Sequence, residues 1–365
     1  MTKEKMEGQA LDPKKAIRLA LLCLSSFVAV VVAAPSIIWK NSAPVSLSPV
    51  ISANPTAEKD SSLPSVYRQG TPSLFIPVYL TKEKKVESLP LETYVRGVLA
   101  AEMPIEFELE ALKAQAMAAR TYIIRKQLEQ DMGNIQPGEA LVTDTINHQV
   151  YVSDLELKAR WGSWYEGNSD KLDQAIRETE GIVLTYDGKP IEANFFSTSN
   201  GYTENSEDYW NTYIPYLRSV PSPWDRTLSP RFKETIELSA AALRNKLGIS
   251  STLSVSAGSG SGLQIIELSQ GHRIKKLRIA GKAFSGREVR EKLGLNSSQF
   301  QWSWQGDRLQ ITTYGYGHGV GMSQWGAQGM ALEGRKAEEI VKYFYTGIEM
   351  GEAANFSKGN NLQKK

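Results

Sequence analysis

The backbone of this chain is most constrained at 315–327, where glycine stands at every second position from 315 to 321 and again at 326. Because glycine has no side chain, this spacing is typical of a backbone that bends sharply or approaches another group closely. Between these glycines lie the hydrogen-bonding and stacking groups of His318, Ser323, Gln324 and Trp325. The segment indicates a ligand site, and the alternative is a glycine-rich hairpin whose His and Trp only pack. It lacks the lysine of a P-loop, which disfavours phosphate as the ligand.

The composition is that of an ordinary globular protein. The 365 residues are 41% hydrophobic, enough to bury one good core and to form two lobes. Lys and Arg number 42 against 40 Asp and Glu, so the net charge of +2 gives no argument for nucleic acid as a partner.

An apolar segment at 16–38 is long enough to cross the hydrocarbon core of a bilayer, which is about 30 Å thick. Lys14, Lys15 and Arg18 lie on its N-terminal side, which predicts residues 1–15 in the cytoplasm and everything after Trp39 outside the cell membrane. Pro35 directly follows two alanines, a poor cleavage site, so an uncleaved single-pass anchor is favoured over a signal peptide.

Metal and disulfide chemistry have few residues available. The one cysteine, Cys23, lies inside the expected anchor, and the three histidines, His148, His272 and His318, are widely separated. We therefore expect no disulfide, no structural zinc and no cofactor.

The rest of the chain divides by composition. Residues 39–73 are rich in Ser, Pro and Ala and are expected to form a flexible linker. Folded sequence is expected at 74–350, with a second lobe at about 228–312, and a polar, frayed tail at 351–365.

Hydrophobic periodicity predicts a mixture of helices and strands in the folded part. A helix at 109–131 is rich in alanine and is expected to be the buried central helix. The predicted fold is α+β, a catalytic domain of two lobes around a groove that follows one transmembrane helix. The other expected elements are a strand at 75–80 with a turn at 81–85, helices at 91–101 and 170–179, strand-like runs at 149–152 and 181–186, a hairpin partner at 190–196, a strand leading into a helix at 232–247, β structure with a turn at 253–279, and a helix at 285–293.

Glu102 lies in the sequence LAAEMP at 99–104, among apolar and small residues at the end of an expected helix. Such surroundings desolvate a carboxylate and raise its pKa, so that it can donate a proton near neutral pH. The alternative, an exposed glutamate with no special role, is equally compatible with this window alone.

The segment 195–210, FFSTSNGYTENSEDYW, combines hydroxyls, amides and aromatic rings after a strand. Proteins hold sugars with such groups, placing flat rings against apolar sugar faces and fixed polar atoms against hydroxyls. Asp144 and His148, in 143–151, are less informative, because a structural histidine is the commoner outcome.

These motifs together resemble the stage II sporulation protein D family, which is related to the amidase-enhancer domain. The resemblance spans about 74–350 and is carried in the same order by AAEMP at 100–104, EALKAQAMAARTY at 110–122, NHQVY at 147–151, the 195–210 segment and GHGVGMSQWGA at 317–327. It implies a membrane-anchored lytic transglycosylase that cuts the glycan strands of peptidoglycan during engulfment of the forespore.

The resemblance also implies roles for residues. Glu102 matches the family's catalytic acid, which would protonate the glycosidic oxygen and then take the proton of the attacking C6 hydroxyl. Zinc, which some members bind through two cysteines and a histidine, is not carried over because the cysteines are absent. An amidase/endopeptidase and a multi-pass membrane protein of the engulfment machinery are the implied partners, and the implied substrate is a peptide-stripped strand. The expected substrate-binding residues are Ser197, Ser199, Tyr202, Thr203, Glu204, Tyr316, His318, Ser323, Gln324 and Trp325.

A function of another class uses the same residues. A glycan-binding module without catalytic activity, which stimulates a partner amidase, would need the same aromatic rings and hydroxyls.

Overall fold

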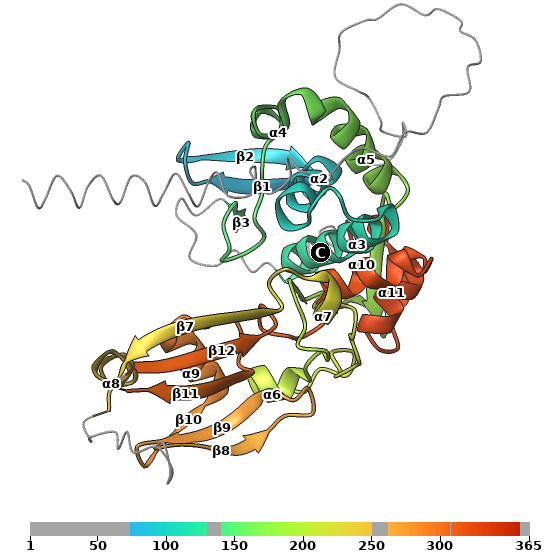
Figure 1. Cartoon of the computed structure of the whole chain (residues 1–365). Coiled ribbons are helices and arrows are strands. Elements are labelled where there is room, and N and C mark those ends of the chain that lie inside the picture. The colour runs from blue at the N-terminus through green and yellow to red at the C-terminus, as the bar shows by residue number, and fades with distance from the viewer. Residues whose placement is uncertain (1–73, 130–139, 250–261, 307, 358–365) are drawn as a thin grey trace, which may run out of the picture. The chain divides into compact units, whose positions relative to one another are not determined.

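The computed structural model describes residues 74–129, 140–249, 262–306 and 308–357 (Figure 1). The expected anchor at 16–38 and linker at 39–73 lie outside these ranges. Within them, no helix is both long and apolar enough to cross a membrane. The expected mixture of helices and sheets is confirmed.

The described chain starts with a small sheet. Strands β1 (Phe75–Leu80) and β2 (Lys85–Pro90) pair antiparallel around the expected turn, and β3 (Val142–Thr143) joins β1 in parallel. Along β1 the residues Ile76, Val78 and Leu80 are buried, the period-2 pattern that turns one face of a sheet to the core.

Two helices follow and form the centre of the larger core. Helix α2 (Leu91–Glu102) ends before Pro104, as expected. Helix α3 (Leu109–Leu128) is followed by a turn residue at Glu129, and the end of the expected helix at 130–131 lies outside the described residues. Helix α3 packs against α2, α5, α10, α11 and β4, so it is the buried central helix (Figure 1). Its many buried alanines permit these close approaches.

Several elements after β3 differ from the expectation. Residues 149–152 are not a strand, and the partner strand expected at 190–196 is reduced to β5 (Lys189–Pro190). The tail is not frayed at its start, because β14 (Glu349–Glu352) pairs with β4 (Ile182–Tyr186) and is followed by α12 (Ala354–Ser357). Between β3 and β4 lie α4 (Asp154–Trp161), which the periodicity did not indicate, a 3-10 turn (Gly162–Trp164) and α5 (Tyr165–Arg177), which starts earlier than expected.

A second hydrophobic core is built from residues between 243 and 311. Two three-stranded antiparallel sheets with the orders β11-β12-β7 and β10-β9-β8 surround it, together with two helices (Figure 1). The strand, helix and β predictions for this region are confirmed over the described residues. The elements are β7 (Lys233–Ser239), α8 (Ala240–Leu247), β8 (Leu263–Leu268), β9 (Ile274–Ile279), β10 (Lys282–Ser285), α9 (Gly286–Leu293), β11 (Phe300–Gln305) and β12 (Arg308–Tyr314).

The chain then returns to the larger core. Strand β13 (Met322–Ser323) pairs in parallel with β6 (Phe195–Phe196), and α10 (Gln324–Leu332) and α11 (Ala337–Phe344) pack on α3. The end of the glycine-rich segment is thus the start of a helix. Two short helices, α6 (Ser206–Trp210) and α7 (Asp225–Leu228), lie in the connection between β6 and β7.

A buried ion pair joins α2 to α3. The guanidinium of Arg120 is fully buried and donates to both carboxylate oxygens of Glu92, at 2.9 and 2.6 Å, and to the main-chain oxygen of Ile182 at 3.2 Å. This bidentate geometry satisfies the charge where water cannot.

Replacing Arg120 with Met should therefore lower the free energy of unfolding by about 3–5 kcal/mol, because it leaves the Glu92 carboxylate without its cation. Urea denaturation of the purified protein measures this. Lys82→Met, which breaks an exposed pair with Glu156, is the control and should leave the free energy of unfolding unchanged within error. Equal losses in the two variants would contradict the role given to Arg120.

Candidate functional site

Glu102 is the last residue of α2 and is half-buried. Its Oε1 accepts a hydrogen bond from the main-chain N–H of Val150 at 3.0 Å, while Oε2 has no hydrogen bond to any residue that the structure describes. Burial raises the pKa of the Glu102 carboxyl, and the Val150 N–H opposes that rise. In the run 149–152, where a strand was expected, the Val150 N–H binds this acid, and the N–H groups of Tyr151 and Val152 donate to the main-chain oxygens of Asp144 and Gly97.

Helix α10 brings the end of the glycine-rich segment to Glu102. Gln324 Nε2 donates to the main-chain oxygen of Glu102 at 3.0 Å across 222 positions of sequence. The ring of Trp325 meets Phe107 edge-on with centroids 4.6 Å apart, and its main-chain N–H donates to the Ser197 oxygen at 3.1 Å. Four predicted site residues, Glu102, Ser197, Gln324 and Trp325, therefore lie in one linked group.

Asp225 ties two further predicted residues into this group. Its fully buried carboxylate accepts from the Ser199 N–H at 2.5 Å, from Ser222 Oγ at 2.6 Å and from Ser323 Oγ at 2.5 Å. Ser199 and Ser323 are themselves fully buried, so they hold loops and present no surface to a ligand. Burial raises the pKa of the Asp225 carboxyl, and these three hydrogen bonds lower it. No periodic or motif signal in the sequence marks Asp225.

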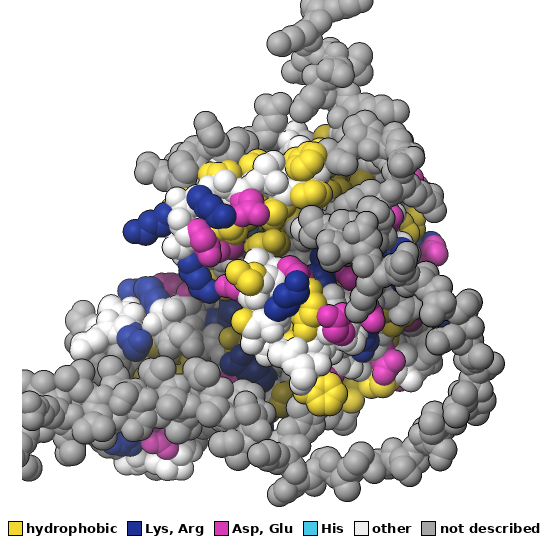
Figure 2. All heavy atoms as spheres, turned by 90° about the horizontal axis from the view of Figure 1, so that it is seen from above, with side chains coloured by type: hydrophobic (Ala, Val, Ile, Leu, Met, Phe, Trp, Pro, Cys, Tyr) yellow, Lys and Arg dark blue, Asp and Glu magenta, His cyan; other side chains and the backbone are white. Residues whose placement is uncertain are grey.

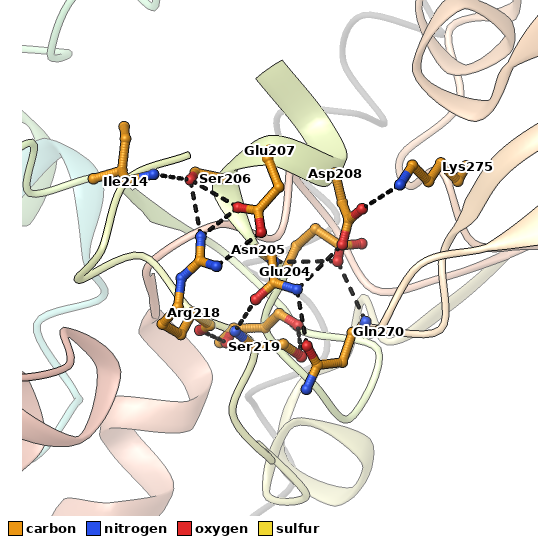
Figure 3. A network of polar contacts seen from close by, with 12 residues as sticks. Glu204, Asn205, Ser206, Glu207, Asp208, Ile214, Arg218, Ser219, Gln270 and Lys275 are labelled. Atoms are coloured by element: carbon orange, nitrogen blue, oxygen red, sulfur yellow. Dashed lines mark hydrogen bonds and ion pairs between the residues drawn. The ribbon is translucent and has the colours of Figure 1, made fainter. Parts of the chain in front are cut away.

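Thr203 and Glu204 are also buried, and Figure 3 shows Glu204 within a network of polar contacts. Glu204 Oε2 accepts from Ser269 Oγ at 2.6 Å and Oε1 accepts from the Gly271 N–H at 3.3 Å. Thr203 Oγ1 donates to the Arg218 main-chain oxygen. Burial raises the pKa of the Glu204 carboxyl, opposed by Arg273 and the Ser269 hydroxyl. Among the described residues, no hydrogen bond or ring contact joins Thr203 or Glu204 to Glu102.

The remaining predicted aromatic residues lie in separate ring contacts. Tyr202 packs against His272 with ring centroids 4.6 Å apart, and the guanidinium carbon of Arg231 lies 3.7 Å from the ring centre of Tyr316. His318 lies among Phe196, Tyr209 and Trp210, and its Nδ1 accepts from the Val320 N–H at 3.1 Å.

His318 is neutral in this environment. Burial lowers the pKa of its imidazole to about 3, and the positive charges of Arg290 and Arg273 add to the effect. A neutral ring can position a hydroxyl, but it brings no positive charge to stabilise a developing anion.

His148 and Asp144 hold the loop that precedes Val150. His148 Nδ1 lies 2.9 Å from Thr143 Oγ1, and the Asp144 carboxylate accepts from the Thr81 N–H at 3.2 Å. In the part of the chain that the structure describes, no three His, Cys, Asp or Glu side chains are grouped so that they could hold a metal ion.

The sequence model of the Stage II sporulation protein family matches residues 79–186, which contain Glu102, α3 and the Val150 loop. Stage II sporulation protein D of Bacillus subtilis (strain 168) is 50% identical over 281 residues, covering 77% of this chain and 80% of that protein. The protein of the same name from Bacillus amyloliquefaciens is 48% identical with the same coverage. The Amidase enhancer of Bacillus subtilis is 31% identical, covering 70% of this chain and 40% of that protein.

The chain with this fold and with the linked group at Glu102 is therefore a sporulation protein. These matches confirm the resemblance that the motifs indicated. The chain belongs to the stage II sporulation protein D family.

Replacing Asp225 with Asn should lower the free energy of unfolding by about 1–3 kcal/mol, because an amide has one acceptor oxygen for the three donors. Chemical denaturation measures the loss. Asp187→Asn is the control, because Asp187 is exposed in a turn with φ of 49°, which asparagine adopts readily. If the two variants have the same free energy of unfolding, Asp225 does not hold the three segments together.

Proposed function

We propose that this protein is a peptidoglycan lytic transglycosylase that cleaves the bond between N-acetylmuramic acid and N-acetylglucosamine. The observation that carries the proposal is the environment of Glu102. Its carboxyl is half-buried, its pKa is raised by burial, and one oxygen is fixed by Val150 while the other is left without a hydrogen bond to the described residues. A carboxyl in such surroundings is suited to donate a proton at pH values where an ordinary glutamate is ionised.

One carboxyl is enough for this reaction. Glu102 donates its proton to the glycosidic oxygen as the bond from C1 to that oxygen breaks. The C6 hydroxyl of the same muramic residue then attacks C1 and passes its proton to the Glu102 carboxylate. The products are a 1,6-anhydro end and a free hydroxyl, no water is consumed, and the acid is regenerated. A glycoside hydrolase of the usual kind needs a second carboxylate, whereas this reaction does not.

The partly exposed residues of the linked group are the proposed glycan contacts. Trp325 offers an aromatic face and Ser197 a hydroxyl. Trp325 directly follows Gln324, which contacts Glu102, and its main-chain N–H donates to Ser197. Tyr202, Tyr316 and His318 are proposed to extend the glycan surface. The buried Ser199, Thr203, Glu204, Ser323 and Gln324 keep these contacts in place.

The cellular setting is part of the proposal. The family places the chain in sporulation, and we propose that residues 16–38 anchor it in the membrane with 74–350 on the outer side, where septal peptidoglycan lies. An amidase/endopeptidase and a multi-pass membrane protein are the proposed partners. On the face shown in Figure 2, basic and acidic side chains are interspersed, which gives no basis for a nucleic-acid partner.

A second function is favoured by one comparison. The relative named Amidase enhancer suggests a glycan-binding module that stimulates an amidase without cutting glycan itself. The residues around Trp325 would serve such a module, but the environment of Glu102 would then have no purpose.

Glu102→Gln keeps the shape of the side chain but cannot transfer a proton. The purified full-length protein should release anhydro-muropeptides from peptide-stripped glycan strands, and this variant should release at least about a hundredfold less, the usual contribution of a general acid. Mass spectrometry of the products measures the release. Glu106→Gln, at an exposed glutamate four residues on, is the matched control and should retain full activity. Unchanged strands with the unaltered protein, together with stimulation of an amidase, would favour the binding module.

The pH dependence follows from the same carboxyl. Because burial raises its pKa above 4.5, Glu102 keeps its proton to higher pH, and the proton is lost as pH rises through that raised value. The initial rate of anhydro-muropeptide release should therefore fall on the alkaline side at a pH above the usual range of glutamate. A decline centred at or below pH 4.5, the ordinary value of a glutamate, would contradict the role of burial.

A further inference from the structure

Two arginines in the described part of the chain are almost completely buried, and their surroundings differ. Arg120 has a carboxylate and a carbonyl as partners. Arg273 is 1% exposed, yet none of its three guanidinium nitrogens has a hydrogen-bond partner. It makes no ion pair with any carboxylate in the described part of the chain.

Such a guanidinium is costly in a folded protein. A buried charge without hydrogen bonds destabilises the fold by several kcal/mol, and buried polar groups are satisfied in nearly all native structures. Stability therefore does not explain why Arg273 is present. Binding of a ligand with hydrogen-bond acceptor atoms does explain it.

A cavity of about 120 Å³ lies in front of this side chain. Its buried end holds Arg273 and Glu204, and its open end is lined by Lys275 and Arg287, whose side chains are 40% and 44% exposed. The acidic residues of the lining are already occupied. Glu204 accepts from Ser269 and Gly271, and Asp208 pairs with Lys275 at 2.8 Å (Figure 3).

The glycine-rich segment fixes the guanidinium in position. Gly319 has φ of 91°, and a side-chain carbon added there would lie 2.4 Å from the guanidinium carbon of Arg273. That carbon also lies 6.0 Å from the ring centre of Phe196. The donors are thus held by packing, which leaves them free for a ligand and keeps them oriented.

We propose that this cavity is a carboxylate-binding subsite in which Arg273 receives the carboxylate as a bidentate ligand. The planar guanidinium matches a carboxylate with two parallel hydrogen bonds, and Lys275 and Arg287 give the entrance a positive charge. The volume has room for several water molecules, and therefore for a carboxylate at the end of a short stem.

The source of the carboxylate rests on the proposed function. A peptidoglycan strand can supply a carboxylate in two ways: as the lactyl group of a muramic residue whose stem peptide has been removed, or as an acidic group of the stem peptide. We take the lactyl group as the source, because the proposed substrate is a peptide-stripped strand and this group is an amide while the peptide is attached. Arg273 would then select stripped glycan.

The first test is the stability of the protein without ligand. Arg273→Met keeps the approximate volume and removes a charge that has no hydrogen bonds. It also removes the positive charge that opposes the rise in the Glu204 pKa, so the midpoint of thermal unfolding should fall only slightly or not at all. Arg120→Met, at the arginine that has its partners, should lower it. If Arg273→Met lowers the midpoint as much as Arg120→Met does, internal water satisfies Arg273 and the proposal is overturned.

The second test is binding to the purified full-length protein, with sodium lactate as the probe and lactamide, which is uncharged, as its control at equal ionic strength. Lactate should raise the unfolding midpoint and lactamide should not. Arg273→Met should lose the effect, with affinity at least about tenfold lower, and Arg273→Lys should keep part of it. A shift that lactamide reproduces, one that Arg273→Met retains, or no shift with lactate would overturn the subsite.

A third measurement separates the two sources. Binding of peptide-stripped glycan, glycan with stem peptides, and chitooligosaccharide without any carboxylate is compared in the Glu102→Gln variant, where cleavage does not interfere. Arg273→Met should weaken only the binding of stripped glycan. A loss confined to peptide-bearing glycan would assign the carboxylate to the stem peptide and overturn selection of stripped strands. None of these three tests measures cleavage. Their results therefore do not depend on whether Glu102 is the catalytic acid.

Discussion

The position of the proposed acid depends on the buried carboxylate of Asp225. Asp225 accepts from Ser323 Oγ, and the same oxygen accepts from the Gly326 N–H at 3.2 Å and so caps α10. The cap fixes where α10 begins, and the first residue of that helix, Gln324, donates to the main-chain oxygen of Glu102. Since Asp225 also binds the Ser199 N–H, one carboxylate sets the relative positions of three segments that are far apart in the sequence. A buried carboxylate is tolerable here because three donors replace its water.

The alternating glycines allow the backbone to lie close to other parts of the same chain. A side-chain carbon added at Gly317, Gly319 or Gly321 would lie 2.7 Å from Phe196 Cβ, 2.4 Å from the guanidinium carbon of Arg273 and 2.0 Å from the Asn194 main-chain oxygen, respectively. The run 315–321 therefore lies directly against the segment that contains β6. The spacing correctly indicated close approach, but what the backbone approaches is the scaffold of the site, and the residues between the glycines are held in place by that contact.

Most regular elements were predictable because their signals are local. Leu91, Tyr94, Val95 and Val98 repeat at helical spacing, and α2 begins and ends close to where that pattern and Pro104 indicate. The incorrect predictions fall where tertiary contacts determine the backbone conformation. Residues 149–152 alternate like a strand, yet the Val150 N–H binds Glu102 and no sheet forms. Motif resemblance marked Glu102 and Gln324 as candidates. Asp225 and Arg273 carry no local signal, because what distinguishes each is the set of hydrogen-bond partners that the folded chain gives it or leaves out.

The segment 315–327 connects the two proposed sites. Gly319 packs on Arg273, and Gln324, five residues later, contacts the residue that carries the acid. Five residues of fully extended chain span at most about 17–18 Å, and this stretch is shorter because Gly321 has a positive φ. The connection is also held at both ends, since the Gly319 main-chain oxygen accepts from the Glu204 N–H at 2.7 Å, and β13 pairs with β6 where the Ser323 cap starts α10. A carboxylate bound at Arg273 would therefore hold a polymeric substrate at a fixed distance from Glu102, so that recognition of one muramic residue sets which glycosidic bond meets the acid.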